Sequence, residues 1–199
     1  DKAVHPVNIM GATKRLAEKV IQSVDSKESN TEFIAVRFGN VIGSSGSVIP
    51  TFQEQIRNGG PVTITNPKMQ RYFMSISEAA QLILQAGAMG SGGEVYVLDM
   101  GKPVNIKDIA YELIRLSGLE PEKDISIEYI GVRPGEKLYE ELKTNNEIII
   151  STSHEKILMM QSKSNETWTD MQTAAEKILN AAKSYNIKII SKEINKHIV

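Results

Sequence analysis

The chain contains no cysteine, which excludes disulfide bonds, thiolate catalysis and zinc sites built on sulfur ligands. Histidine is also scarce: His5, His154 and His197 lie far apart in the sequence, and we therefore expect no metal site. No apolar run approaches the roughly 18–20 residues that a membrane-spanning helix requires. The formal net charge is −1, so the composition favours neither nucleic acid nor an anionic membrane as a partner.

What is present is the composition of an ordinary soluble protein. Hydrophobic residues make up 41% and charged residues 24% of the 199 residues, which is enough for one domain or for a larger and a smaller lobe. The lack of cysteine fits a reducing compartment, and we expect a cytoplasmic location. The chain begins at Asp1 rather than at a methionine, so we expect it to be a piece of a longer protein.

Periodic patterns predict alternating helices and strands. Helices are expected at residues 8–24, 51–60, 76–90, 105–118 and 170–185, with N-caps at Ser77 and Asn105. Strands are expected at residues 33–38, 61–65, 94–100, 125–131 and 146–151, whereas the charged residues 189–199 are expected to fray. This alternation is typical of an α/β fold with a parallel sheet. No strand is followed by a G-x-G-x-x-G turn, so a Rossmann unit would have its first half before Asp1.

Met10 and Lys14 are four residues apart on the first predicted helix, so their side chains share a face. Short-chain dehydrogenases have a tyrosine and a lysine at this spacing, where the lysine holds the nicotinamide ribose and promotes ionisation of the tyrosine. A thioether cannot take up a proton. The spacing alone therefore favours Met10 as a core residue and Lys14 as a surface charge.

Longer stretches of the chain resemble one family. The segment DKAVHPVNIMGATKRLAEK is similar to the active-site segment of the nucleotide-sugar 4,6-dehydratases, a branch of the extended short-chain dehydrogenases. It is followed by VRFGNVIGSSGSVIPTFQEQI, GGPVTITNPKMQRYFMSISEA and GVRPGEKLYEEL. These blocks resemble, in the same order, the long, membrane-anchored, CapD-like polysaccharide biosynthesis proteins, which carry methionine where shorter members carry tyrosine. The resemblance extends from Asp1 to about Leu142.

The resemblance implies an α/β fold that is the C-terminal part of a Rossmann-type short-chain dehydrogenase, with a small α/β substrate-binding lobe. Residues 1–143 would contain the last Rossmann strands and this lobe, and residues 144–199 a C-terminal extension with an amphipathic helix. The implied activity is that of an NAD-dependent UDP-N-acetylglucosamine 4,6-dehydratase in capsule, O-antigen or glycan precursor synthesis. The implied partners are the UDP-sugar and further copies of the chain, in a parent protein anchored at the cytoplasmic face of the membrane.

The family reaction implies roles for the first residues of the chain. Oxidation at C4 of the sugar acidifies the C5 hydrogen, and a bound NAD can accept the C4 hydride and return it to C6. The resemblance implies Lys2 as the base at C5, Asp1 as the acid at the C6 oxygen and Lys14 as the NAD-binding group. Met10 occupies the catalytic position without a proton acceptor, so Asp1 is also the candidate for the C4 hydroxyl proton, ahead of a bound water.

Read without the resemblance, Asp1 and Lys2 are interpreted as solvated charges. Neighbouring residues of a strand point to opposite faces of the sheet, so a joint role requires that the chain forms a loop here.

The resemblance also implies substrate-binding residues. Arg71 and Arg133 match arginines that bind the diphosphate, and Glu136 matches the acid that accepts from the ribose hydroxyls. Asn40 would hydrogen-bond the substrate, and Val48 belongs to a loop, residues 44–48, that would wrap the nucleotide. The alternative interpretation makes Arg71 a surface charge and the RPGE segment a polar turn.

Other functions are compatible with the same motifs. A related UDP-sugar dehydratase that also epimerises C5, a 4-epimerase and a non-catalytic UDP-sugar-binding module all remain open. Epimerases usually keep the tyrosine and lack an Asp-Lys pair, so Lys2 and Met10 argue against the 4-epimerase. We expect the isolated chain to bind NAD poorly and not to turn over, because the turn that binds the pyrophosphate is missing.

Overall fold

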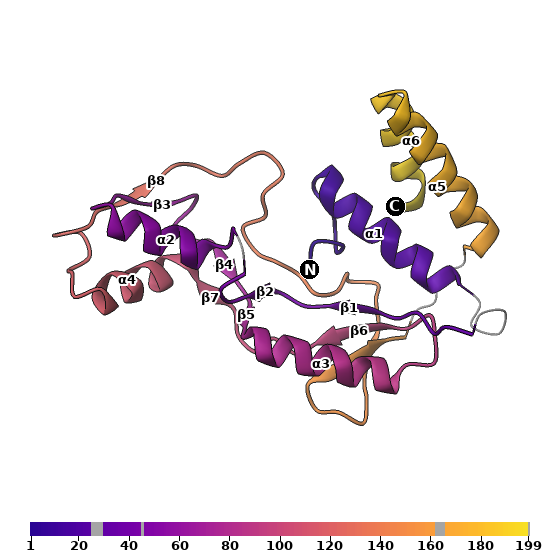
Figure 1. Cartoon of the computed structure of the whole chain (residues 1–199), viewed down its shortest axis with the longest axis horizontal. Coiled ribbons are helices and arrows are strands. Elements are labelled where there is room, and N and C mark those ends of the chain that lie inside the picture. The colour runs from indigo at the N-terminus through magenta and orange to yellow at the C-terminus, as the bar shows by residue number, and fades with distance from the viewer. Residues whose placement is uncertain (25–29, 45, 162–165, 199) are drawn as a thin grey trace. The chain divides into compact units, whose positions relative to one another are not determined.

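The computed structural model describes residues 1–24, 30–44, 46–161 and 166–198. The chain divides into two compact units. Unit 1 comprises Asp1–Phe38, Leu82–Asp99 and Glu141–Val199, and unit 2 comprises Gly39–Gln81 and Met100–Glu140. Figure 1 labels the elements of both units. Helix α3 (Ile76–Met89) begins in unit 2 and ends in unit 1, so the chain passes between the units within this helix as well as through loops.

The sheet of unit 1 has the strand order β1 (Ala35–Arg37), β6 (Val95–Leu98), β10 (Ile157–Met160) and β9 (Ile149–Ser151). β1 is parallel to β6, as predicted, but β10 runs antiparallel to both of its neighbours. The sheet is therefore mixed rather than parallel. Every residue of β6 is buried, because this strand is central and has neighbours on both edges.

Three helices of unit 1 pack together. Helix α1 (Ile9–Ser23) begins after Asn8, whose side chain accepts a hydrogen bond from the backbone N–H of Gly11 at 2.8 Å. Helix α5 (Trp168–Lys183) and helix α6 (Ile187–Ile198) lie side by side next to α1 (Figure 1).

The prediction that residues 189–199 fray is wrong for the described part of this segment. α6 presents an apolar face, and Ile194 is only 1% exposed, so packing stabilises the helix despite its charges. The predicted division of the sequence at residue 143 stays a prediction.

Unit 2 combines short strand pairs with two complete helices and the first residues of α3. β2 (Asn40–Val41) pairs with β5 (Phe73–Met74) and β3 (Val62–Ile64) with β8 (Ile127–Tyr129), both in parallel, whereas β4 (Gln70–Arg71) and β7 (Val104–Asn105) are antiparallel. Helices α2 (Val48–Arg57) and α4 (Ile106–Leu116) pack against β3. The shared core includes Phe52, Ile64 and Ile114.

Helix caps test two of the predictions made from the sequence. Asn105 caps α4 as predicted, accepting from the Lys107 N–H at 2.8 Å. α3 starts one residue before Ser77, and the side chain of Ser75 instead accepts from the Glu78 N–H at 3.1 Å. None of the described helices combines the length and the apolar character that crossing a membrane requires.

Candidate functional site

A pocket with a volume of about 280 Å³ opens in unit 2. Its wall is built from β2, the start of α2, the end of β3, β4 and the segment that follows β8. It contains all of the residues predicted to bind substrate, which are Asn40, Val48, Arg71, Arg133 and Glu136. Residues far apart in the sequence are thus gathered around one cavity, although each role stays a prediction. Of the loop predicted at residues 44–48, Ser45 lies outside the described residues.

Arg71 lies in β4 with only 11% of its side chain exposed. Its terminal nitrogens donate to the backbone carbonyls of Gln70, Lys137 and Leu138 at 2.7–3.1 Å. Burial lowers the pKa of Arg71, and nearby carboxylates, chiefly that of Glu140 at 3.5 Å, compensate only in part. The carbonyl groups hold the guanidinium in place without neutralising it, and the Glu140 and Glu136 carboxylates lie 3.5 and 4.0 Å away, too far for short hydrogen bonds. The guanidinium can therefore still contribute positive charge to an anion in the pocket.

Arg133 and Glu136 form a turn at the edge of the pocket. The Glu136 carboxylate accepts from the Arg133 backbone N–H at 3.1 Å and from the Thr65 hydroxyl at 3.3 Å. The Arg133 side chain is exposed, and its guanidinium has no ion-pair partner in the described part of the chain. It is therefore available to a ligand. A guanidinium fork of this kind can donate two parallel hydrogen bonds to phosphate oxygens.

Asn40 contributes an unsatisfied polar atom. Its backbone N–H donates to the Tyr72 carbonyl at 2.9 Å, whereas its side-chain oxygen is buried and has no hydrogen-bond partner among the described residues. Leaving a buried polar atom unpaired costs roughly 1–3 kcal/mol, so such an atom in a pocket wall fits a contact with a ligand. Val48, the first residue of α2, supplies apolar surface to the same wall.

Three threonine hydroxyls of the pocket are not among the residues predicted from the sequence. Thr63 and Thr65 line it from β3 and its end, and Thr51 lines it from α2. The alternating pattern of PVTIT was the available signal, because it places both threonines on the face opposite the buried Val62 and Ile64.

The predicted catalytic residues lie in unit 1. The Lys2 ammonium contacts both carboxylate oxygens of Asp1 at 2.9 Å, and the two side chains are 41% and 6% exposed, respectively. Residues 1–8 form neither helix nor strand, so the loop that a joint role requires is present. The two neighbouring side chains can therefore meet, which strand geometry would prevent.

The loop that contains this pair packs against α1. A Cβ atom added to Gly11 would lie 2.6 Å from the Lys2 carbonyl oxygen and 3.1 Å from the Pro6 Cβ, so glycine permits the close approach. The backbone nitrogen of Asp1 donates to the Phe38 carbonyl at 3.2 Å, just beyond the end of β1. The loop is thus held between the helix and the strand.

Met10 and Lys14 are exposed on α1. The interpretation of Met10 as a core residue is wrong, because 49% of its surface is exposed. The buried side of the helix is formed instead by Ala12 and Leu16, which lie about half a turn away from Met10 and Lys14. Asp1, Lys2, Met10 and Lys14 all belong to unit 1, whereas the pocket belongs to unit 2.

Within the described ranges, no group of three or more His, Asp and Glu side chains is placed to hold a metal ion. His5, which the sequence places near the start, instead contacts the Glu141 carboxylate at 2.6 Å.

Comparison with known proteins gives a family match. Residues 1–162 match the model of a family described as polysaccharide biosynthesis protein. The capsular polysaccharide biosynthesis protein CapD of Staphylococcus aureus is 65% identical over 157 residues, which are 79% of this chain and 26% of that protein. A UDP-glucose 4-epimerase of Rickettsia bellii is 37% identical over 74% of this chain and 42% of its own length. The chain thus spans less than half of these relatives.

Solved structures show the same fold. The structure of Pen from Bacillus thuringiensis has 36% identity and a TM-score of 0.72, covering 83% of this chain and 52% of that one. A dTDP-glucose 4,6-dehydratase of Bacillus anthracis in complex with NAD has 19% identity and a TM-score of 0.55, covering 65% of this chain and 42% of that one. The fold is therefore α/β, of the Rossmann-like kind found in short-chain dehydratases and epimerases.

Proposed function

Since the chain belongs to the polysaccharide biosynthesis protein family, we propose that it is part of an NAD-dependent dehydratase acting on UDP-N-acetylglucosamine. The reaction would remove water across C5 and C6 and yield a 4-keto-6-deoxy sugar. The observation that carries this proposal is the pocket of unit 2, in which two arginines, a glutamate and an unsatisfied asparagine oxygen converge. A diphosphate flanked by two sugars matches these groups in charge and in hydrogen bonding.

The groups of the pocket would divide the nucleotide-sugar between them. Arg133 would bind the diphosphate through its exposed fork, and Arg71 would add a buried positive charge. The Glu136 carboxylate would accept from the ribose hydroxyls, because an ionised carboxylate is an acceptor only. Asn40 would satisfy its buried oxygen with a hydroxyl or amide donor of the substrate.

The residues of α1 fit an NAD molecule. Lys14 presents an exposed ammonium one helical turn after Met10, which suits hydrogen bonding to the hydroxyls of a ribose. When bound, NAD supplies a reversible hydride acceptor. The task of Lys14 in this proposal is to hold and orient the nicotinamide ribose.

Asp1 and Lys2 would move the protons. Since the Met10 thioether accepts no proton, the Asp1 carboxylate is the proposed acceptor of the C4 hydroxyl proton, and the acid so formed would pass this proton to the departing C6 oxygen, which leaves as water. Lys2, whose nitrogen lies 2.9 Å from that carboxylate and whose side chain is 41% exposed, would first release a proton to solvent. The neutral amine would then take the C5 proton and return it to C5 when the hydride is delivered to C6.

A 4-epimerase is a second candidate, because the Rickettsia bellii relative carries that name. Met10 and the Asp1–Lys2 pair argue for the dehydratase, since a 4-epimerase needs a proton acceptor near C4 but no acid at C6. NMR of the product separates the two: a C6 methyl group indicates dehydration, and an unchanged hydroxymethyl group with inverted C4 indicates epimerisation.

Calorimetric titration of the chain with UDP-N-acetylglucosamine tests the pocket directly, because every residue proposed to bind the sugar nucleotide lies in unit 2. Replacing Arg133→Ala removes the exposed fork and is expected to weaken binding by at least about 10-fold, as one charge-assisted contact is worth roughly 1.5–3 kcal/mol. Arg57→Ala, an exposed arginine of α2 that does not line the pocket, is the matched control. Equal affinities of the two variants would contradict the proposal.

A further inference from the structure

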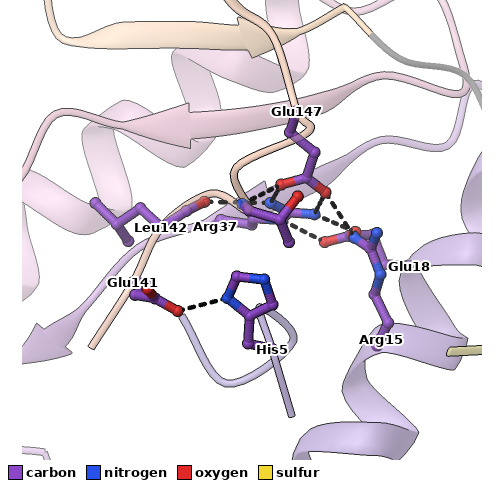
Figure 2. Close-up of polar contacts among 8 residues, drawn as sticks. His5, Arg15, Glu18, Arg37, Glu141, Leu142 and Glu147 are labelled. Atoms are coloured by element: carbon purple, nitrogen blue, oxygen red, sulfur yellow. Dashed lines mark hydrogen bonds and ion pairs between the residues drawn. The ribbon is translucent and has the colours of Figure 1, made fainter. Parts of the chain in front are cut away.

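A second group of charges lies in unit 1, and none of its members lines the pocket. Figure 2 shows Arg15, Glu18, Arg37 and Glu147 in mutual contact, and we refer to these residues as the charge cluster. The side chain of Arg37 is 2% exposed, and those of Glu18 and Glu147 are 5% and 6% exposed. Arg15, with 18% exposure, closes the cluster on the solvent side.

The contacts of the charge cluster saturate Arg37. Its Nε and Nη2 atoms donate to the two oxygens of Glu18 at 2.7 and 2.6 Å. Its Nη1 and Nη2 atoms donate to the two oxygens of Glu147 at 2.7 and 2.9 Å. Arg15 bridges the same two carboxylates from the other side, at 2.5 and 3.0 Å. Each carboxylate is therefore bound by both guanidinium groups.

The charge cluster joins three segments of unit 1. Arg15 and Glu18 belong to α1, Arg37 is the last residue of β1, and Glu147 precedes β9. Arg37 also donates to the Leu142 carbonyl at 3.2 Å. Helix, strand and connecting segment are thus held by directional contacts at one point.

A buried charge cluster of this kind contributes little net stability compared with apolar residues. Removing these ions from water costs several kcal/mol each, and apolar side chains of similar size often stabilise a protein as well or better. The charge cluster instead fixes geometry. Its planar guanidinium groups can make all of their hydrogen bonds in only one rotation and one axial position of α1. The value of the charge cluster therefore lies in where it holds α1.

The residues held in this way include the proposed catalytic groups. Lys14 precedes Arg15 directly and lies one turn before Glu18 on α1. The strand that ends at Arg37 continues to Phe38, whose carbonyl accepts from the Asp1 backbone nitrogen. The charge cluster thus connects the helix of Lys14 to the strand that anchors the loop of Asp1.

We propose that the charge cluster positions α1, and with it Lys14, relative to the Asp1–Lys2 loop. Arg37, Glu18 and Glu147 are positioning residues in this sense. That this position of α1 matters for catalysis rests on the proposed function. That the charge cluster fixes the position of α1 does not depend on the proposed function.

The test compares an apolar variant of the charge cluster with the original protein. Glu18→Met, Arg37→Met and Glu147→Met are combined, because replacing all buried charges together leaves none of them unpaired. Since the chain has no cysteine, Thr13→Cys on α1 and Ser153→Cys beyond β9 allow two spin labels to be attached at exposed positions of unit 1. Double electron–electron resonance then reports the distance distribution between helix and sheet.

If the charge cluster positions α1, the two spin labels of the original protein give one narrow distance distribution. In the apolar variant this distribution becomes at least about twice as wide, while the melting temperature of the variant is equal to or higher than that of the original protein. In a preparation that converts UDP-N-acetylglucosamine, kcat falls at least about 10-fold while KM for the sugar nucleotide changes less than about 2-fold. The control replaces Glu112→Met and Arg115→Met, an exposed pair on α4, and leaves width and kcat unchanged. An unchanged width in the apolar variant overturns the proposal.

A conservative variant covers the case in which the apolar variant does not fold. Glu18→Gln keeps the size of the side chain and one acceptor oxygen but loses the charge that binds both arginines. It is expected to widen the distance distribution by a smaller amount, and an unchanged width again overturns the proposal. If the original protein binds no UDP-sugar, the proposed function fails, and the distance distribution still decides on the position of α1.

Discussion

Arg37 is buried and Arg71 is largely buried, with 2% and 11% of their side chains exposed, yet their surroundings differ in kind. Arg37, in unit 1, is enclosed by the carboxylates of Glu18 and Glu147. Burial acts against its charged form, but these hydrogen bonds outweigh burial and raise the pKa of Arg37. Arg71, in unit 2, is held mainly by backbone carbonyls, and burial lowers its pKa.

The difference separates a structural cation from one that is suited to binding. A guanidinium saturated by carboxylates contributes no net attraction to a further anion. A guanidinium whose short hydrogen bonds go to neutral carbonyls, with carboxylates only at 3.5 and 4.0 Å, is less fully compensated, and an anionic ligand lessens the cost of its burial. Burial alone therefore does not identify a binding arginine, whereas the chemical nature of its partners does.

Removing Arg37 should have the largest effect on stability. Arg37→Met leaves two buried carboxylates with Arg15 as their remaining guanidinium, and we expect the free energy of unfolding to fall by about 3–5 kcal/mol. Trp168, the single tryptophan, lies on α5 of unit 1, so its fluorescence during urea denaturation follows this unit. The more conservative Arg37→Lys keeps the charge without the planar fork and should lose less. A loss below about 1 kcal/mol for Arg37→Met would show that Arg37 is not a structural cation.

Removing Arg71 should cost less stability and more binding. Arg71→Met leaves backbone carbonyls without their donor, which costs roughly 1–3 kcal/mol. The affinity for UDP-N-acetylglucosamine should fall at least about 10-fold, because the pocket loses its buried positive charge. Titration calorimetry measures the affinity, with Arg37→Met at a permissive temperature as the contrasting variant. Unchanged affinity in Arg71→Met would assign this arginine a structural role like that of Arg37.

The residues that line the pocket were easier to predict from the sequence than the charge cluster that holds α1. Asn40, Arg71 and Arg133 stand in contiguous blocks whose similarity to a family is visible locally. The charge cluster has no such local pattern, since Arg37 is 19 residues from Glu18 and 110 residues from Glu147. Only folding brings these charges together.

The elements show the same division between local and distant causes. The Asn105 cap follows from neighbouring residues, and the structure confirms it. Strand β10 (Ile157–Met160) was not predicted, because a short apolar run becomes a strand only when it finds the edges of β6 and β9. Likewise, α6 is stabilised by packing that its charged sequence does not reveal.

The smallest expected effect is a dependence of unit 1 on acid. Burial raises the pKa of Glu147, but hydrogen bonds from Arg37 and from the Thr144 N–H outweigh burial and lower it to about 2, from an ordinary value of 4.5. Since the pKa is depressed in the folded state, the stabilisation is complete well above pH 4.5 and is lost as the pH falls toward 2. Between pH 7 and pH 4 this loss amounts to about 1 kcal/mol.

Glu147→Gln isolates this contribution. The variant is less stable at pH 7, but its free energy of unfolding should decrease by about 1 kcal/mol less than that of the original protein between pH 7 and pH 4. Urea denaturation followed by Trp168 fluorescence measures both values, and Glu128→Gln, an exposed residue of β8 in unit 2, is the control that should follow the original protein. Parallel curves for Glu147→Gln and the original protein would mean that Arg37 does not hold this carboxylate ionised, and the contrast with Arg71 would then lose its basis.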